Sequence, residues 1–228
     1  MTKPHLFKPF GDLPIFFIPF DAERFCDSAF AAAHIVCPEH IARSVVKRRA
    51  EFFHGRLCAQ MALAEHNIVR ANVGIGARRE PIWPARMMGS ISHTRTLAAA
   101  VTVLAEHRRG IGIDLELASE GNIVGAMGDI VVRDAELACL RSARGAFDLH
   151  QLLVVVFSAK ESFFKATYNV VREYFDFDAV EVVAIDMEVG SIKLVVRKNL
   201  CALLRAGDVH EARFAMLDNG HVLTMMSW

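Results

Sequence analysis

The order of hydrophobic periodicities is the feature that most constrains the fold. A long block with helical spacing is followed by strand-like segments, and the same order then recurs further along the chain. The predicted helices cover residues 39–67, 134–142 and 157–174, and the predicted strands cover residues 97–104, 110–117, 180–187, 192–197, 211–217 and 221–228. Helices and strands in separate runs favour an α+β fold with mostly antiparallel sheet.

Turn and cap signals support this division. Asn67 suits the C-terminal cap of the first long helix, and the Asn219-Gly220 step predicts a hairpin between the last two strands. Residues 1–37 contain several prolines and are expected to be extended. The glycine-rich residues 118–130 are the candidate link between two parts of the chain.

Composition excludes several classes of protein. Of the 228 residues 53% are hydrophobic, enough for a sizeable core, and the 26 basic residues balance 26 acidic ones, which argues against a dedicated nucleic-acid binder. The apolar run at 152–157 is far too short to span a membrane, and the N-terminus lacks a signal-peptide layout. Five widely spaced cysteines without a CxxC indicate reduced thiols in the cytoplasm rather than a zinc site or disulfides.

The segment GIGIDLEL at 110–117 alternates with a period of two. Asp114 and Glu116 therefore share one face of a strand, roughly 7 Å apart. Two carboxylates at this spacing can bind Mg²⁺, which prefers oxygen ligands and keeps several waters or phosphates. The alternative is the solvent-facing edge of an amphipathic strand.

The segment FSAKESFFKATY at 157–168 predicts a helix with one apolar and one polar side. Ser158, Glu161, Ser162, Lys165 and Asn169 cluster on the polar side. One interpretation makes Glu161 and Lys165 part of a metal and phosphate site. The other makes Ser158 and Glu161 a capping box at the start of the helix, with Glu161–Lys165 as a surface ion pair.

Cations and a serine–histidine pair lie upstream. Arg49 and Arg56 are seven residues apart, on one face of the first long helix, where Lys47 and Arg48 add charge. Arg79 precedes the segment EPIWP, and Ser92 and His93 lie in the segment SISHT. Guanidinium groups clamp phosphates well, although a run of charge is also typical of a solvated face.

The ordered segments SISHT, GIGIDLE and FSAKESFFK together resemble the signatures of the phosphopantetheinyl transferases. The resemblance is to the monomeric, surfactin-type class, and within it to the enterobactin-synthase-component-D-like branch, which KRRAEFFHGRLCAQMAL and REPIWP also resemble. It covers about residues 40–170.

The resemblance implies a pseudo-twofold α+β fold of two similar lobes, 1–108 and 109–228, each with a helix packed on a small antiparallel sheet and with coenzyme A in the cleft. It implies a cytoplasmic monomer that transfers 4′-phosphopantetheine from coenzyme A to a serine of an apo acyl or peptidyl carrier protein, as in siderophore or fatty acid biosynthesis. The reaction would depend on Mg²⁺ and release adenosine 3′,5′-bisphosphate, and no nucleic acid or membrane would take part.

Site residues follow from the same resemblance. Asp114, Glu116 and Glu161 match the metal carboxylates, and Glu161 is also a candidate base. Lys165 matches a catalytic, phosphate-binding lysine. The matches to groups that bind coenzyme A are Arg49, Arg56, Ser92 and His93.

The sequence departs from the family pattern at two places. Glu80 stands where many relatives have a lysine before the proline, so Arg79 is the candidate replacement. Phe157 stands where many relatives have tryptophan.

Two other functions remain open at this stage. One is a different Mg²⁺-dependent phosphoryl transferase or hydrolase that uses the same carboxylates. The other is a non-catalytic module that binds coenzyme A or a carrier protein, although the intact set of Asp114, Glu116, Glu161 and Lys165 argues against it. A carrier is expected to dock near residues 118–133, where Ile123, Val124, Met127 and Ile130 are apolar.

Overall fold

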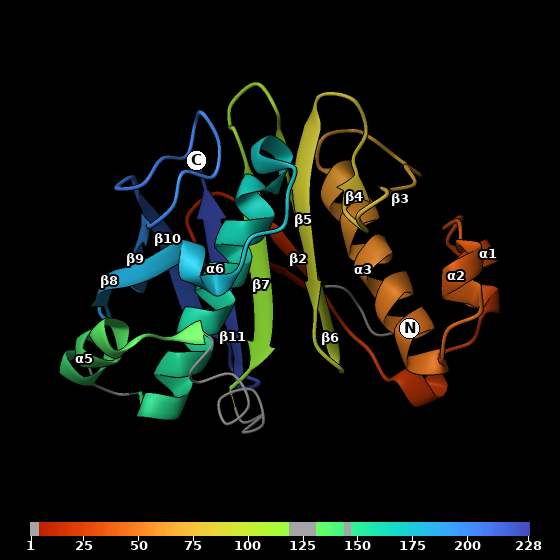
Figure 1. Ribbon diagram of the computed structural model, residues 1–228. Coiled ribbons are helices and arrows are strands. Elements are labelled where there is room, and N and C mark those ends of the chain that lie inside the picture. The colour runs from red at the N-terminus through yellow and green to blue at the C-terminus, as the bar shows by residue number, and fades with distance from the viewer. Residues whose placement is uncertain (1–4, 119–130, 144–146) are drawn as a thin grey trace. The chain divides into compact units, whose positions relative to one another are not determined.

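A computed structural model describes residues 5–118, 131–143 and 147–228 (Figure 1). The chain divides into two compact units, Met1–His107 and Arg108–Trp228, beside an expected division between residues 108 and 109. Residues 119–130, which include most of the expected link at 118–130 and the apolar residues of the expected carrier surface, lie outside the described residues. Both of those expectations stay predictions from the sequence.

The first unit packs one long helix on an antiparallel sheet. Its strands are β1 (His5–Phe7), β2 (Ile15–Pro19), β5 (Met87–His93) and β6 (Leu97–Leu104), in the order β1-β2-β6-β5, and a separate pair is formed by β3 (Gly74–Ile75) and β4 (Pro81–Ile82). Figure 1 shows α3 (Val46–Ala64) running along this sheet. The buried face of α3 includes Ala50, Cys58 and Leu63, which pack against alanines of β6.

The predicted helix 39–67 is two helices in the structure. α2 (Glu39–Ala42) ends at Arg43, and α3 begins after Val45, which has extended backbone angles. The Ser44 hydroxyl donates to the His40 carbonyl at 2.8 Å, a local bond that competes with continuation of the helix. Asn67 has a left-handed φ of 60°, as expected of a residue that follows a helix.

The expectation that residues 1–37 are extended throughout is wrong. The 3₁₀ turn η1 (Ala22–Arg24) and helix α1 (Ser28–Ala32) lie within this range. Asp21 caps η1 by accepting from the Glu23 N–H at 2.9 Å, and Phe30 of α1 packs in a cluster with Phe52 and Phe53 of α3. Tertiary packing therefore makes a short helix where the prolines suggested only extended chain.

The second unit has a five-stranded antiparallel sheet. Its strands are β7 (Ile111–Leu117), β8 (Val180–Asp186), β9 (Ser191–Val196), β10 (Val209–Met216) and β11 (His221–Ser227), in the order β7-β11-β10-β9-β8. β10 and β11 form the predicted hairpin, with Gly220 at a φ of 77°. β6 and β7, which are neighbours in the sequence, belong to different sheets.

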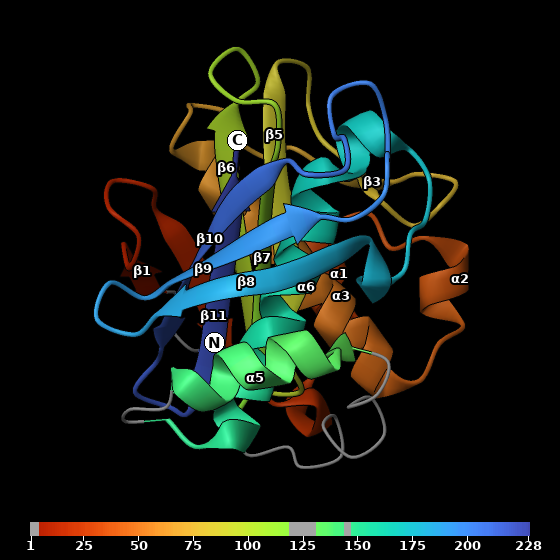
Figure 2. The ribbon, with the colours of Figure 1, turned by 60° about the vertical axis from the view of Figure 1, so that its left-hand side comes forward.

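Helices α5 (Asp134–Ser142) and α6 (Leu149–Val171) belong to the same unit, together with the 3₁₀ turn η2 (Phe177–Ala179). Figure 2 shows α5 beside the edge strand β8, and Figure 1 shows α6 along β7 and β11. The α+β class with a helix on an antiparallel sheet in each unit is confirmed, and the pseudo-twofold relation stays a prediction. Within the described ranges, no helix is both long and apolar enough to cross a membrane.

Candidate functional site

β7 presents its two kinds of side chain to opposite faces, as its alternation predicts. Ile113 and Leu115 are buried on one face, and Asp114 lies on the other. Asp114 is only 3% exposed, so the alternative of a solvent-facing strand edge is wrong at this position. A carboxylate buried to this degree needs charged or hydrogen-bonding partners.

The glycines of GIGIDLE allow α6 to approach β7 closely. A Cβ on Gly110 would lie 1.8 Å from the Ala166 carbonyl oxygen, and one on Gly112 would lie 2.1 Å from the Ser162 carbonyl oxygen. Any side chain at either position would collide with the backbone of the helix. The two glycines therefore set the distance between α6 and the strand that carries Asp114.

Lys165 of α6 reaches the carboxylate of Asp114. Its Nζ lies 2.6 Å from Oδ1, and the lysine side chain keeps 26% of its surface exposed. Burial lowers the pKa of Lys165, but the charges of Asp114, Glu161 and Glu116 outweigh this and leave the pKa above its usual value. Three carboxylates thus act on one ammonium group.

Glu161 lies one turn before Lys165 on α6. Burial raises the pKa of its carboxyl, Lys165 lowers it and Asp114 raises it again, so that the net shift is upward. A carboxylate that is partly desolvated in this way is a stronger proton acceptor than one in water. The site therefore contains a group suited to general base catalysis.

The capping interpretation of Ser158 and Glu161 is wrong. α6 begins at Leu149, where Asp148 and Gln151 form the capping box. Ser158 lies inside the helix, and it is buried together with Ser162. Both hydroxyls contact the Thr224 hydroxyl of β11, at 2.9 and 2.6 Å, so this side of the expected polar face packs on the sheet.

The donor set of this cluster fits a divalent cation in its chemistry. Three carboxylates and one ammonium leave an excess of negative charge, and carboxylate oxygens are the ligands that Mg²⁺ prefers. Among the residues that the structure describes, no three His, Cys, Asp or Glu side chains are arranged so that they could hold a metal as they stand. Lys165 lies against the Asp114 oxygen instead.

A second polar site belongs to the first unit. A cavity of about 460 Å³ is lined by α2, α3, the β3–β4 pair and β5, and three arginines and two histidines contribute to it: Arg48, Arg56, Arg79, His40 and His93. The α3 residues of its wall follow the spacing i, i+3, i+4, i+7 and i+8 from Arg48 to Arg56, which is one face of a helix. Gly55 of this face allows close packing, because a Cβ there would lie 2.9 Å from Ile91 of β5.

Arg56 is the most enclosed of these cations. It donates to the Val73 and Gly74 carbonyl oxygens at 2.7 and 3.1 Å, and its guanidinium lies over the Phe52 ring at 4.7 Å. Burial, together with the charge of Arg48, lowers the pKa of Arg56 to about 10. Glu51 of the same wall lies 3.5 Å from Arg48, and three guanidinium groups against one carboxylate leave a net positive charge that favours the binding of an anion.

Arg48 was not among the residues predicted to bind a ligand. Its Nη1 lies 3.1 Å from His93 Nε2, which must accept because a guanidinium only donates. His93 therefore carries its proton on Nδ1 in this contact. Counting back from Arg56 by eight residues, a spacing that stays on one helix face, would have identified Arg48. The spacing of seven residues used for the prediction identified Arg49.

Arg49 and Ser92 lie away from this cavity wall. Arg49 donates to Asp27 at 2.8 Å and also bonds the Ser44 carbonyl oxygen. Ser92 is buried on the face of β5 opposite to His93, since successive side chains of a strand alternate. A role for either residue in binding coenzyme A stays a prediction.

Glu80 has a local structural role in the β3–β4 connection. Its carboxylate accepts from the Arg78 N–H at 2.9 Å, and its side chain covers Gly76, where a Cβ would lie 2.1 Å from the Glu80 carboxyl carbon. The same turn holds Arg79 at a φ of 70° and places it in the cavity wall. The structure thus brings Arg79, rather than residue 80, to the arginine cavity.

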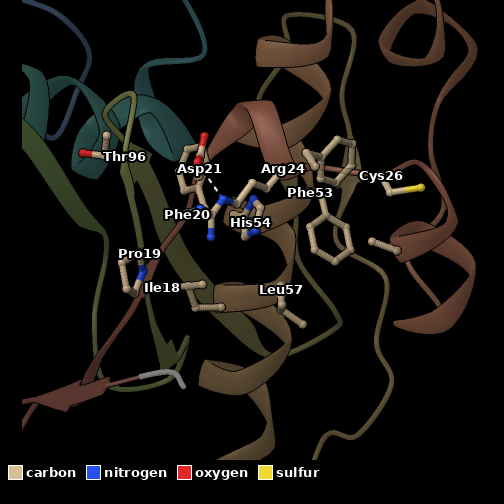
Figure 3. A pocket seen from close by; sticks show the side chains of 12 residues that line it. Ile18, Pro19, Phe20, Asp21, Arg24, Cys26, Phe53, His54, Leu57 and Thr96 are labelled. Atoms are coloured by element: carbon tan, nitrogen blue, oxygen red, sulfur yellow. Dashed lines mark ion pairs between the residues drawn. The ribbon is translucent and has the colours of Figure 1, made fainter. Parts of the chain in front are cut away.

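A larger cavity of about 760 Å³ lies on another face of α3 (Figure 3). Phe20 and His54 stack there with ring centroids 4.4 Å apart, and Arg24 is paired with Asp21 at 3.4 Å. Most of the other lining side chains are apolar. This cavity has a single arginine, paired with Asp21, whereas three arginines line the other cavity, so it suits a polyphosphate less well.

Two family models match this chain, one in each unit. Residues 37–103 match the family model of the 4′-phosphopantetheinyl transferase N-terminal domain, and residues 110–225 match the 4′-phosphopantetheinyl transferase superfamily. Enterobactin synthase component D of Escherichia coli (strain K12) is 36% identical over 168 residues, which cover 73% of this chain and 77% of that protein. The 4′-phosphopantetheinyl transferase Npt of Nocardia iowensis is 34% identical over 154 residues, 67% of each chain. The transferase Svp of Streptomyces mobaraensis is 33% identical over 173 residues, 73% of this chain and 68% of that protein.

Proposed function

Because this chain belongs to the 4′-phosphopantetheinyl transferase superfamily, we propose that it transfers 4′-phosphopantetheine from coenzyme A to a serine of an apo carrier protein, with Mg²⁺ as cofactor. The observation that carries the proposal is the contact of Lys165 with Asp114 at 2.6 Å, beside Glu161 and Glu116. A partly exposed lysine among carboxylates suits a reaction at a pyrophosphate.

The arginine cavity is the proposed site for the nucleotide end of coenzyme A. Arg48, Arg56 and Arg79 supply positive charge, and a cavity of about 460 Å³ has room for a phosphorylated nucleoside. Guanidinium groups can contact a phosphate through two N–H groups at once. The energy of binding there holds the pyrophosphate in place for reaction, which is the usual use of remote contacts.

Chemistry is proposed at the carboxylate cluster of the second unit. The Oγ of the carrier serine attacks the phosphorus that bears pantetheine, a new Ser–O–P bond forms, and the P–O bond to adenosine 3′,5′-bisphosphate breaks. Glu161 takes the serine proton, which its raised pKa favours. Lys165 donates to a phosphate oxygen and stabilises the charge that grows on the leaving group.

Asp114, Glu116 and Glu161 are the residues that would hold the magnesium ion. When bound, the ion neutralises charge on the pyrophosphate oxygens and orients them for displacement. Lys165 then exchanges its contact with Asp114 for one with phosphate. The negative phosphate oxygens would then replace the Asp114 carboxylate as the partner that favours the charged form of Lys165.

The name of the relative from Escherichia coli ties that protein to enterobactin synthase, so a peptidyl carrier domain of siderophore synthesis is the first substrate to test, and a fatty-acid carrier is the second. We propose that the enzyme acts in the cytoplasm as a monomer.

One experiment tests the function directly. The protein is incubated with coenzyme A, Mg²⁺ and an apo carrier, and the intact mass of the carrier is measured. A gain of one phosphopantetheine arm on the wild-type carrier, with no gain on a carrier whose acceptor serine is replaced by alanine, supports the proposal. Release of adenosine 3′,5′-bisphosphate without carrier modification would indicate a hydrolase instead, and binding of coenzyme A without either product would indicate a binding module.

A further inference from the structure

A buried ion pair lies directly beside the proposed catalytic residues of α6. Lys160 is 2% exposed and Glu136 of α5 is fully buried, and Lys160 Nζ lies 2.8 Å from Glu136 Oε1. The same ammonium donates to the Val131 carbonyl oxygen at 2.6 Å and is 3.4 Å from the Phe177 carbonyl oxygen. An ammonium has three donors, so each has an acceptor here.

The carboxylate of Glu136 is satisfied to the same degree. Oε1 accepts from the Val182 N–H of β8 at 2.8 Å, and Oε2 accepts from the Arg133 N–H at 2.8 Å. The pair therefore joins five pieces of the second unit: residues 131–133, the first turn of α5, the turn η2, the start of β8 and the middle of α6. A network with every member bonded specifies one arrangement of the elements around it.

Stability alone does not account for a pair of this kind. The cost of desolvating two buried charges often exceeds their attraction, and well-packed apolar side chains of similar size are commonly as stable. The directional bonds of Lys160, in contrast, fix where α6 lies relative to α5 and β8. A role in the placement of α6 fits these observations better than a role in overall stability.

A second set of bonds holds another side of α6. Ser158 and Ser162 contact Thr224, and Thr224 pairs in register with Asp114 of β7. At about 100° per residue, Lys160 points away from the two serines by roughly 160°. The helix is thus held on nearly opposite sides, so its rotation about its own axis is restricted.

We propose that the buried Glu136–Lys160 pair is a positioning pair, which fixes the rotation of α6 so that Glu161 and Lys165 face Asp114. The inference rests on the proposed transferase function. With side chains reaching about 5 Å from the helix axis, a rotation of about 10° displaces their ends by roughly 0.9 Å. A displacement near 1 Å can lower turnover about 100-fold.

The test is the double variant Glu136→Gln/Lys160→Met, which removes both charges together. Its melting temperature and circular dichroism establish that it folds, and the kinetics are measured well below its melting temperature. We expect kcat for carrier modification to fall about tenfold or more, while KM for coenzyme A changes less than about threefold, because the proposed nucleotide contacts lie in the other unit. Lys198→Met is the control, since it removes an exposed lysine paired with Asp178 at 2.6 Å, and it should leave kcat unchanged.

A folded double variant with wild-type kcat overturns the inference while the proposed function stands. An inactive wild-type protein overturns the proposed function, and the inference with it. If the double variant does not fold, Glu136→Asp decides, because it keeps both charges and shortens the carboxylate side chain by one methylene group. A folded Glu136→Asp protein with reduced kcat and unchanged KM supports the positioning role, and one with unchanged kcat contradicts it.

Discussion

Removing the charge of Glu161 should affect turnover and stability in opposite directions. Its folded-state pKa lies above the usual value because of burial, so ionisation at neutral pH opposes folding of the metal-free protein. We expect Glu161→Gln to lower kcat by about 100-fold or more, while the melting temperature in chelator holds or rises. Linkage gives the sign of the effect. Glutamine increases the free energy of unfolding near neutral pH, and this increase disappears below about pH 4, where the wild-type carboxyl is protonated in both the folded and the unfolded protein. Melting curves of both proteins across pH, and turnover at limiting Mg²⁺, check this; near-normal turnover would leave Glu161 without a role in the reaction.

Adjacent arginines of α3 offer a matched comparison at the same scale. Arg48 lines the arginine cavity, whereas Arg49 is bound to Asp27 and Ser44. We expect Arg48→Ala to raise KM for coenzyme A about tenfold or more, as loss of a charged hydrogen bond would, with little change in kcat. Arg49→Ala should lower the melting temperature and leave KM alone. The effect of Arg48→Ala should shrink with dephospho-coenzyme A if the cavity holds the 3′-phosphate, and equal effects of the two variants would contradict this assignment.

The approach of α6 to β7 determines the site at the scale of elements. A Cβ at position 112 would meet the Ser162 carbonyl oxygen at 2.1 Å, so Gly112→Ala must push the helix away from Asp114. We expect the free energy of unfolding to fall by about 1–3 kcal/mol. We also expect kcat to fall by more than it does in a control variant with a similar loss of stability. Leu204→Ala is the control, because it truncates a fully buried side chain of the same unit and should cost a similar or larger free energy of unfolding. If Leu204→Ala lowers kcat as much as Gly112→Ala does at equal residual stability, the glycine has no special role in placing α6.

The same pair of elements shows what the sequence could and could not predict. Alternation in residues 110–117 placed Asp114 on the correct face, and the local spacing of Glu161 and Lys165 placed both on one side of a helix. The predicted helix began at residue 157, whereas α6 begins at Leu149. Residues 152–157 are apolar on all sides because the helix is covered on several sides there, so they show no helical alternation of polar and apolar residues. The sequence placed Ser158 and Ser162 on a polar side of the helix and assigned no role to Lys160. Their partners, Thr224 for the serines and Glu136 for the lysine, are distant in the sequence, and only tertiary packing brings them together.

For the whole molecule, the proposed function requires that the arginine cavity of one unit and the carboxylate cluster of the other act on the same coenzyme A. The sequence predicts a monomer, in which both sets belong to one chain. At a coenzyme A concentration well below KM, where Arg48→Ala protein is expected to be slow, mixing it with Asp114→Ala protein should then give no more activity than the sum of the two alone, since every molecule has a defect in one set. Size-exclusion chromatography with light scattering should give a mass near 25.3 kDa. Recovery of activity on mixing would instead show that two chains share a site, because a hybrid pair would contain one complete set of groups. Co-expression of both variants in one cell is the stricter form of the same test, since it allows hybrid pairs to assemble during folding.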